Sequence, residues 1–139
     1  MTRPRIVLGV AAGALLIGSG AAHSLLGWPA LTAELARAEA PADLVDGLAI
    51  GWHFGGLAMV VFGAIAISLF VDRLRGRPAA LRPVLLIALA NLTFGGWALI
   101  DSGFEPMFLS FVIPALMLLG ASLGASDAPP SAPRRDTRG

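Results

Sequence analysis

Four apolar stretches dominate this sequence, and each is long enough to cross a lipid bilayer as a helix. They cover about residues 6–26, 48–71, 83–100 and 106–123, and none has an Arg, Asp or Glu in its interior. A helix needs ~20 apolar residues to cross ~30 Å of hydrocarbon at a rise of ~1.5 Å per residue. Alternation with a period of two is absent, and a membrane barrel needs more strands than this length allows. We therefore predict an all-α integral membrane four-helix bundle with four transmembrane helices.

The composition favours a membrane protein over a soluble one. Of the 139 residues, 56% are hydrophobic and only 14% are charged, against about 25% charged residues in typical soluble domains. A small soluble domain has too little interior to bury so much apolar surface. Cys is absent, so disulfides and thiolate metal sites are excluded. These features exclude a soluble enzyme, a disordered protein and a nucleic-acid-binding domain.

The arginines predict how the helices are oriented. The positive-inside rule places the loops richest in basic residues in the cytoplasm. Nine of the ten arginines fall on one side of the expected spans, namely Arg3, Arg5, Arg73, Arg75, Arg77, Arg82, Arg134, Arg135 and Arg138. Both termini are therefore expected in the cytoplasm. Because all basic residues are Arg, a usage associated with GC-rich bacterial genomes, we expect a bacterial inner-membrane protein.

Three tryptophans support this topology. Trp28, Trp52 and Trp97 lie at the outer ends of the first three expected helices. Indole rings favour the membrane–water interface, where the ring is buried and the N–H stays wet. We interpret all three as interface anchors.

The extracytoplasmic and terminal segments complete the expected domain organisation. Residues 29–46 form the only sizeable outer loop, and its centre predicts a short amphipathic helix between helices one and two, with a Glu34–Arg37 pair. Residues 1–124 are expected to form one transmembrane domain, and residues 125–139 a disordered cytoplasmic tail. An alternative is that residues 1–22 are a cleaved signal peptide, since small residues follow a basic start and an apolar run.

Glycines inside the spans predict close helix packing. Small residues let membrane helices approach each other and gain dispersion contacts. Three sets have a spacing of four, and we expect them to form packing seams: Gly47, Gly51 and Gly55; Gly9 and Gly13; Gly120 and Gly124. Such a seam suits either the bundle itself or a homo-oligomer.

The few polar residues of the spans gather toward one end of the bundle. His23, His53, Asp101 and Glu105 lie near the outer ends of their helices, and Asn91 lies well inside its own. Counted from the nearest tryptophan, His23 and Asn91 lie at similar depths, about 7.5 and 9 Å inside, while His53 is shallower. Intramembrane ionisable residues are candidate functional sites by default, so these five residues are candidates for a ligand pocket or a proton relay.

Three classes of function follow. The first is a non-enzymatic membrane protein that binds a partner helix, a lipid or a small apolar ligand at its outer half. The second is a redox membrane subunit in which His23 and His53 bind haem or a divalent metal, since imidazole suits Zn, Cu and Fe. The third is an oligomeric transporter of protons or a small solute. Against all three stands the interpretation that these side chains only pack or hydrogen-bond between helices. No motif for a hydrolase, a phosphate-binding loop or a zinc protease is present.

Overall fold

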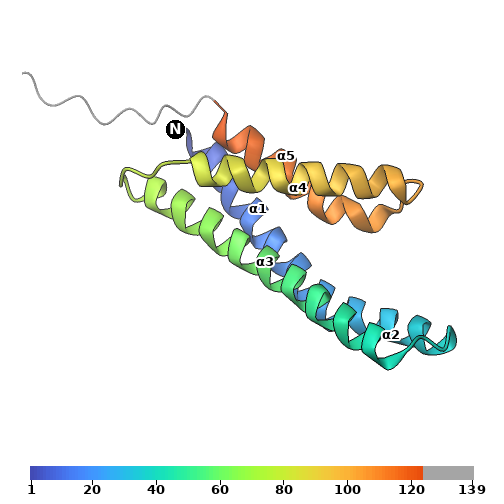
Figure 1. The fold of residues 1–139 in the computed structure, drawn as a ribbon. Helices are drawn as coiled ribbons and strands as arrows, with labels where there is room; N and C mark the ends of the chain where they lie inside the picture. Colours follow the sequence, from blue (N-terminus) through green and yellow to red (C-terminus); the bar gives the residue numbers. More distant parts are fainter. Residues whose placement is uncertain (124–139) are drawn as a thin grey trace, which may run out of the picture.

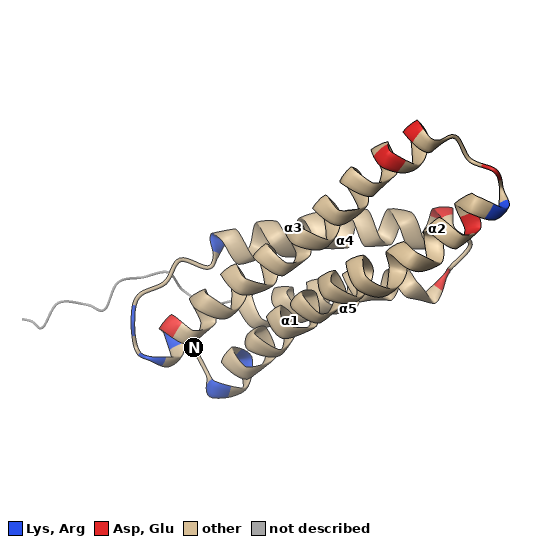
Figure 2. Ribbon diagram, turned by 90° about the horizontal axis from the view of Figure 1, so that it is seen from below, with Lys and Arg blue, Asp and Glu red and all other residues tan. Residues whose placement is uncertain are grey.

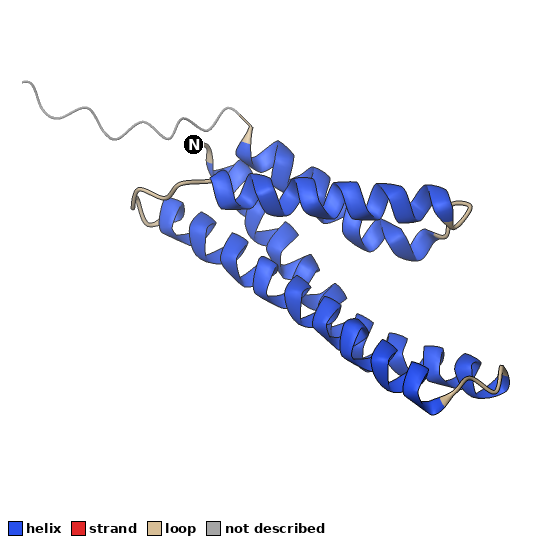
Figure 3. Ribbon diagram, in the orientation of Figure 1, coloured by secondary structure: helices blue, strands red, loops and turns tan. Residues whose placement is uncertain are grey.

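The computed structural model describes residues 1–123, and its regular elements are all helical (Figure 3). Gly124 and the predicted tail at 125–139 lie outside the described residues. The elements, in chain order, are α1 (Arg3–Ala22), a π-helical turn η1 (His23–Gly27), α2 (Trp28–Arg37), α3 (Ala42–Leu74), α4 (Arg82–Asp101), a single 3-10 turn η2 (Pro106–Phe108) and α5 (Leu109–Ser122). The prediction of an all-helical chain is confirmed for this part of the sequence.

Three helical segments of the described chain are long and apolar enough to cross a membrane. They are Arg3–Arg37, Ala42–Leu74 and Arg82–Asp101, while Pro106–Ser122 is apolar but shorter. At ~1.5 Å per residue the first two are about 50 Å long, well beyond the ~30 Å of a hydrocarbon core. The described fold thus has two long apolar helices and a shorter helical hairpin, and three of its helical segments have the length and composition of membrane spans.

The first long helix corrects the expectation of a sizeable outer loop after Trp28. The chain stays helical through η1 and α2 to Arg37, and only residues 38–41 connect it to α3. Pro29 would break a regular α-helix, because its ring clashes with the carbonyl four residues back and it has no N–H. The wider π turn just before Pro29 accommodates both defects. The predicted amphipathic helix is therefore present, but it continues the first helix.

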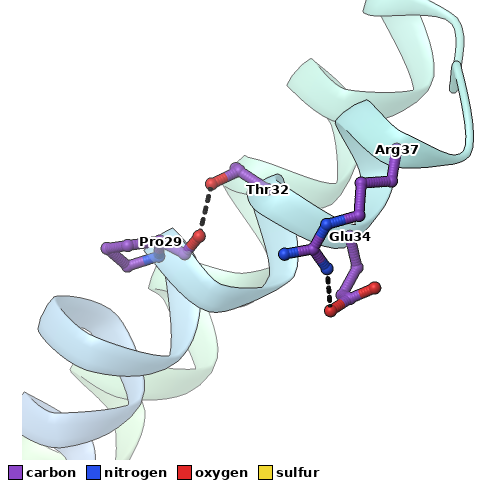
Figure 4. A network of polar contacts seen from close by, with 4 residues as sticks. All are labelled: Pro29, Thr32, Glu34 and Arg37. Carbon is purple, nitrogen blue, oxygen red and sulfur yellow. Dashed lines mark hydrogen bonds and ion pairs between the residues drawn. The ribbon is translucent and has the colours of Figure 1, made fainter.

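Two local contacts stabilise α2 (Figure 4). The hydroxyl of Thr32 donates to the carbonyls of Trp28 and Pro29, at 3.1 and 3.0 Å. The predicted Glu34–Arg37 ion pair forms as well. Because both of its side chains are about 70% exposed, this pair contributes only a few tenths of a kcal/mol.

Helices α1 and α3 pack along an antiparallel seam of small residues. The buried positions of this seam alternate in spacing between three and four residues: Ile6, Gly9, Gly13, Leu16 and Gly20 on α1, and Gly56, Met59, Gly63, Ala66 and Phe70 on α3. Such a period of 3.5 keeps one face of each helix against its partner. A Cβ built on Gly13 would lie 2.8 Å from the carbonyl oxygen of Gly63. The two backbones therefore touch, as small residues allow in membrane helices.

The second hairpin, α4 and α5, joins this pair at one end only. Helix α5 packs against α1, where Arg5 donates to the carbonyl of Leu123 at 2.8 Å, whereas α3 and α4 make few contacts. The buried core lies at this end and includes Ile6, Phe70, Val84 and Leu118. Away from it, the α4–α5 hairpin and the long α1–α3 pair diverge (Figure 1). One half of the molecule is closed and the other half is open.

Most charges of the described residues separate along the same axis (Figure 2), and the exceptions, Asp72 and Arg37, are each paired with an opposite charge at their own end. We call the closed end, with Arg3, Arg5, Arg73, Arg75, Arg77 and Arg82, the basic end. We call the other end, with Glu34, Glu39, Asp43, Asp46, Asp101 and Glu105, the acidic end. The diverging half of the fold lies toward the acidic end.

Candidate functional site

A cavity of about 580 Å³ occupies the space where the two helix pairs diverge. Residues of η1 and α3 line one side, and residues of α4, η2 and α5 line the other. No Arg, Asp or Glu is among the lining residues. The fold therefore leaves a sizeable uncharged hollow, because α3 and α4 are too far apart at this level to fill it.

The two sides of the cavity are lined by different residue types. On α3, the lining includes Gly47 and Gly51, and a Cβ at either would have no described atom within 4 Å. The opposite wall is aromatic: Phe94 and Phe111 line it in an edge-to-face pair with ring centroids 5.0 Å apart, and Phe108 lies beside them in the lining. The α3 side also contributes Trp52 and Phe62 to the lining, so aromatic rings occur on both sides of the cavity and glycines leave open space on one, which suits a flat or bulky apolar occupant.

His23 brings an imidazole to this cavity from the first position of η1. Its ring stacks on the indole of Trp52, with centroids 4.1 Å apart and planes 9° apart. The indole N–H of Trp52 donates a 2.7 Å hydrogen bond to the backbone carbonyl of His23. Next to it, Nε2 of His23 lies 3.7 Å from where a Cβ on Gly55 would be, so this glycine leaves room for the imidazole. Ring and backbone of His23 are thus both held by α3.

Asn91 brings an amide to the cavity from α4. Its side chain is only 4% exposed, and its Nδ2 donates to the carbonyl of Ile87, one turn back on the same helix, at 2.9 Å. Within residues 1–123 its carbonyl oxygen has no hydrogen-bond partner. Asn91 therefore makes no polar bridge to another described helix, and its acceptor remains available.

The other predicted site residues lie elsewhere. His53 is exposed, packs against Trp28 at a centroid distance of 5.5 Å and does not line the cavity. Asp101 ends α4 and Glu105 precedes η2, and both are exposed outside the cavity lining. The structure thus brings His23 and Asn91 together around one cavity and leaves the other three candidates apart.

The three tryptophans differ in their exposure and in the residues they contact. Trp97 is 61% exposed, as suits a ring that faces lipid or the interface. Trp28 and Trp52 are partly buried and lie 6.3 Å apart, each beside a histidine of the opposite helix. The structure adds a specific role for Trp52, which the sequence interpretation as an interface anchor did not include.

The predicted glycine seams are placed as follows. Gly9 lies against the ring of Phe70 and Gly13 against Gly63, so both lie in the α1–α3 seam, while Gly120 lies near Leu8. Gly47 and Gly51 face the cavity, and Gly124 is outside the described residues. The sequence analysis missed Gly20 and Gly56, which an alternating spacing of three and four would have found.

The described residues contain no group of three or more His, Asp or Glu side chains that could hold a metal ion. His23 and His53 come from opposite helices, and each packs against a tryptophan of the other helix. Binding of haem or a divalent metal by this pair therefore remains a hypothesis from the sequence.

Comparisons with protein families, with curated proteins and with solved structures found no match to this chain. The class of protein therefore follows from the fold alone. The described chain is all-helical, with three helices long and apolar enough to cross a membrane.

Proposed function

We propose that this protein is a polytopic, non-enzymatic protein of the bacterial inner membrane, and that its cavity binds a small apolar ligand taken from the bilayer. The observation that carries the proposal is the uncharged cavity between the diverging helix pairs. Its volume of about 580 Å³ falls within the ~300–1,000 Å³ typical of small-molecule sites. Such sites are mostly apolar, with a few polar groups that fix the ligand's orientation, and His23 and Asn91 have that character here.

We place four helices across the membrane, with both termini in the cytoplasm. The separation of the basic and acidic ends supports this orientation, because cytoplasmic loops carry an excess of Arg. The shorter helix from Pro106 to Ser122 would cross as the fourth span. In this orientation the cavity lies in the outer half of the membrane, where apolar molecules in the outer leaflet can reach it.

The glycine wall favours a ligand over simple collapse of the fold. A Cβ at Gly47 or Gly51 would meet no described atom within 4 Å, although larger apolar side chains at these positions would fill the hollow and add dispersion contacts. Leaving them as glycine costs helix stability and keeps the space open.

A binding measurement with a neutral fluorescent probe, phenylnaphthylamine, tests the proposal. The full chain carries Trp28→Phe and Trp97→Phe, so that Trp52, which lines the cavity, is the only energy donor. It is reconstituted in lipid nanodiscs, and probe emission excited through Trp52 is recorded against empty nanodiscs. We expect saturable transfer at one probe per chain. A signal that rises linearly with probe, as partition into lipid would give, overturns the proposal.

Two matched glycine variants locate the site. Gly51→Leu would project into the cavity, whereas Gly96→Leu would occupy a position on α4 outside the lining, where a Cβ also has no described neighbour within 4 Å. We expect Gly51→Leu to weaken probe binding by about tenfold or more, because its side chain takes the ligand's space. Gly96→Leu should leave it unchanged. Equal effects would place the probe outside the cavity. If the probe does not enter the cavity, the proposal of a small ligand is rejected, and a partner helix becomes the favoured occupant.

A further inference from the structure

We propose that the ligand of this cavity is an uncharged, ring-bearing molecule with a hydroxyl group, which it donates to the side-chain carbonyl of Asn91. This inference rests on the proposed function and names the chemistry of its ligand. Three observations carry it: an unpaired acceptor on an almost fully buried residue that lines the cavity, a second polar group held in place beside the same cavity, and a lining that is aromatic and without charge.

The unused acceptor belongs to Asn91. Its Nδ2 donates to the carbonyl of Ile87, which fixes the orientation of the amide, since a backbone carbonyl accepts only from the NH₂ side. The amide oxygen is then left without a partner among residues 1–123, in a residue that is only 4% exposed. This oxygen is not among the fully buried unpartnered atoms, which is consistent with its residue lining the cavity, and an acceptor left unpaired away from water is costly. A donor on the ligand removes this cost.

The second polar group is the imidazole of His23, which lines the cavity from η1. The imidazole also makes a hydrogen-bond contact with the backbone of Trp52, and the stack on the Trp52 indole limits how the ring can turn. A neutral imidazole both donates and accepts. A hydroxyl group is the ligand function that matches Asn91, because its one proton is donated to the amide oxygen and its own oxygen remains an acceptor beside the imidazole of His23.

The remaining lining residues indicate the chemistry of the apolar part of the ligand. Phe62, Phe94, Phe108 and Phe111 line the cavity, and no charged side chain does. A charged ligand would lose its hydration without gaining a counter-charge here. Aromatic side chains pack favourably against rings in offset or edge-to-face geometry. These features favour a neutral ring system over a phospholipid headgroup or an ion.

A pair of probes that differ by one hydroxyl group tests the inference. Naphthol and naphthalene share a ring system, and each is titrated against bound phenylnaphthylamine in nanodiscs that contain the full chain. Affinities are expressed relative to the amount of each probe dissolved in the bilayer. This corrects for the different partitioning of naphthol and naphthalene between water and lipid. We expect naphthol to bind about fivefold more tightly than naphthalene, the ratio that one net hydrogen bond supplies.

Variants then assign the preference to its residues. Asn91→Leu keeps the approximate shape of the side chain, and it should reduce the naphthol-to-naphthalene ratio to about one. The matched control is Thr93→Val, an exposed polar position on α4 outside the lining, which should keep the ratio. Should Asn91→Leu fail to fold, His23→Phe carries the test, since it keeps a ring to stack on Trp52 but removes both nitrogens. We expect it to lower the ratio as well.

The outcomes separate the two proposals. If both probes displace phenylnaphthylamine equally well, or if the ratio survives in Asn91→Leu and in His23→Phe, the inference about the hydroxyl group is overturned and the apolar binding function stands. If neither probe displaces it and phenylnaphthylamine itself does not saturate, the binding function fails too.

Discussion

Trp52 holds His23 at two points, through the stacked rings 4.1 Å apart and through a 2.7 Å hydrogen bond from the indole N–H to the His23 carbonyl. That carbonyl belongs to the first residue of the π turn, where the regular backbone ladder of the helix changes. π turns inside α-helices are frequent at functional sites. One side chain of α3 thus stabilises the irregular backbone and orients the imidazole that lines the cavity.

This double contact predicts a measurable cost for Trp52→Phe. Phenylalanine can keep the stacking but loses the N–H, so we expect the free energy of unfolding to fall by about 1 kcal/mol. Reversible unfolding in mixed micelles, followed by far-UV circular dichroism, measures it. Trp97→Phe is the control: its ring is 61% exposed, and we expect a change below about 0.5 kcal/mol. Equal losses in both variants would mean that the indole hydrogen bond contributes nothing.

The α1–α3 seam predicts opposite effects of the same substitution at two glycines of α3. A Cβ at Gly63 would lie 2.7 Å from Cγ1 of Ile17, so Gly63→Ala should destabilise the fold by about 1–3 kcal/mol through overpacking. Gly47→Ala meets no described atom within 4 Å, and it should stabilise the helix by up to about 1 kcal/mol, because Ala is the better helix former. The same unfolding assay compares them. The packing described here is wrong if Gly63→Ala is as stable as Gly47→Ala.

Pro29 predicts a rotation of α2. Replacing it with Ala restores an N–H and removes the ring, so the wide turn at His23–Gly27 should relax toward a regular α-helix. Loss of the extra residue of a π turn would rotate α2 by about 100°, the angle per residue of an α-helix. The chain has no Cys, so single cysteines report the rotation cleanly through their rates of reaction with a water-soluble maleimide.

Leu35 and Ala36 are suitable positions for this measurement, since Leu35 is half-buried and Ala36 is exposed. With Pro29 present, Ala36→Cys should react faster than Leu35→Cys. In the Pro29→Ala background we expect the difference to shrink or reverse. An unchanged pattern would show that contacts with α3, and not the proline, determine the π turn.

The proposed orientation predicts which loops face outward. Single cysteines at Ala38, Arg75 and Ser102, all exposed, are treated with a membrane-impermeant maleimide on intact cells. Because Ala38 and Ser102 lie at the acidic end and Arg75 at the basic end, we expect the first two to react directly and Arg75→Cys to react only after permeabilisation. Reaction of Ala38→Cys and Arg75→Cys from the same side would refute the topology.

Much of the helical architecture could be predicted from hydropathy. The stretches at 48–71 and 83–100 correspond to α3 (Ala42–Leu74) and α4 (Arg82–Asp101). The end of the first helix could not, because Trp28 and Pro29 read as the start of a loop. Local preference places a proline at a helix boundary, and only the π turn, with the Trp52 contact from α3, allows the helix to continue.

The candidate site was only partly predictable. Similar depths below Trp28 and Trp97 indicated that His23 and Asn91 lie at one level, and both line the cavity. His53, one residue after Trp52, was also a candidate, at a shallower depth, but it lies on the exposed side of α3. Neighbouring residues on a helix differ in direction by about 100°, so depth alone does not determine which of them reaches the cavity.

The sequence by itself determined that this chain is helical, that its helices are long and apolar, and that its charges separate to two ends. A lipid-facing backbone must satisfy its own hydrogen bonds, and charged side chains are costly in hydrocarbon, so both features appear directly in the order of residues. Only the tertiary structure decided which small residues pack and which line a cavity. Gly13 and Gly51 look alike in sequence, but Gly13 lies against Gly63, whereas a Cβ at Gly51 would meet no described atom within 4 Å. That difference arises because the helix pairs are in contact at the basic end and diverge toward the acidic end, a relation between distant segments that no local pattern contains.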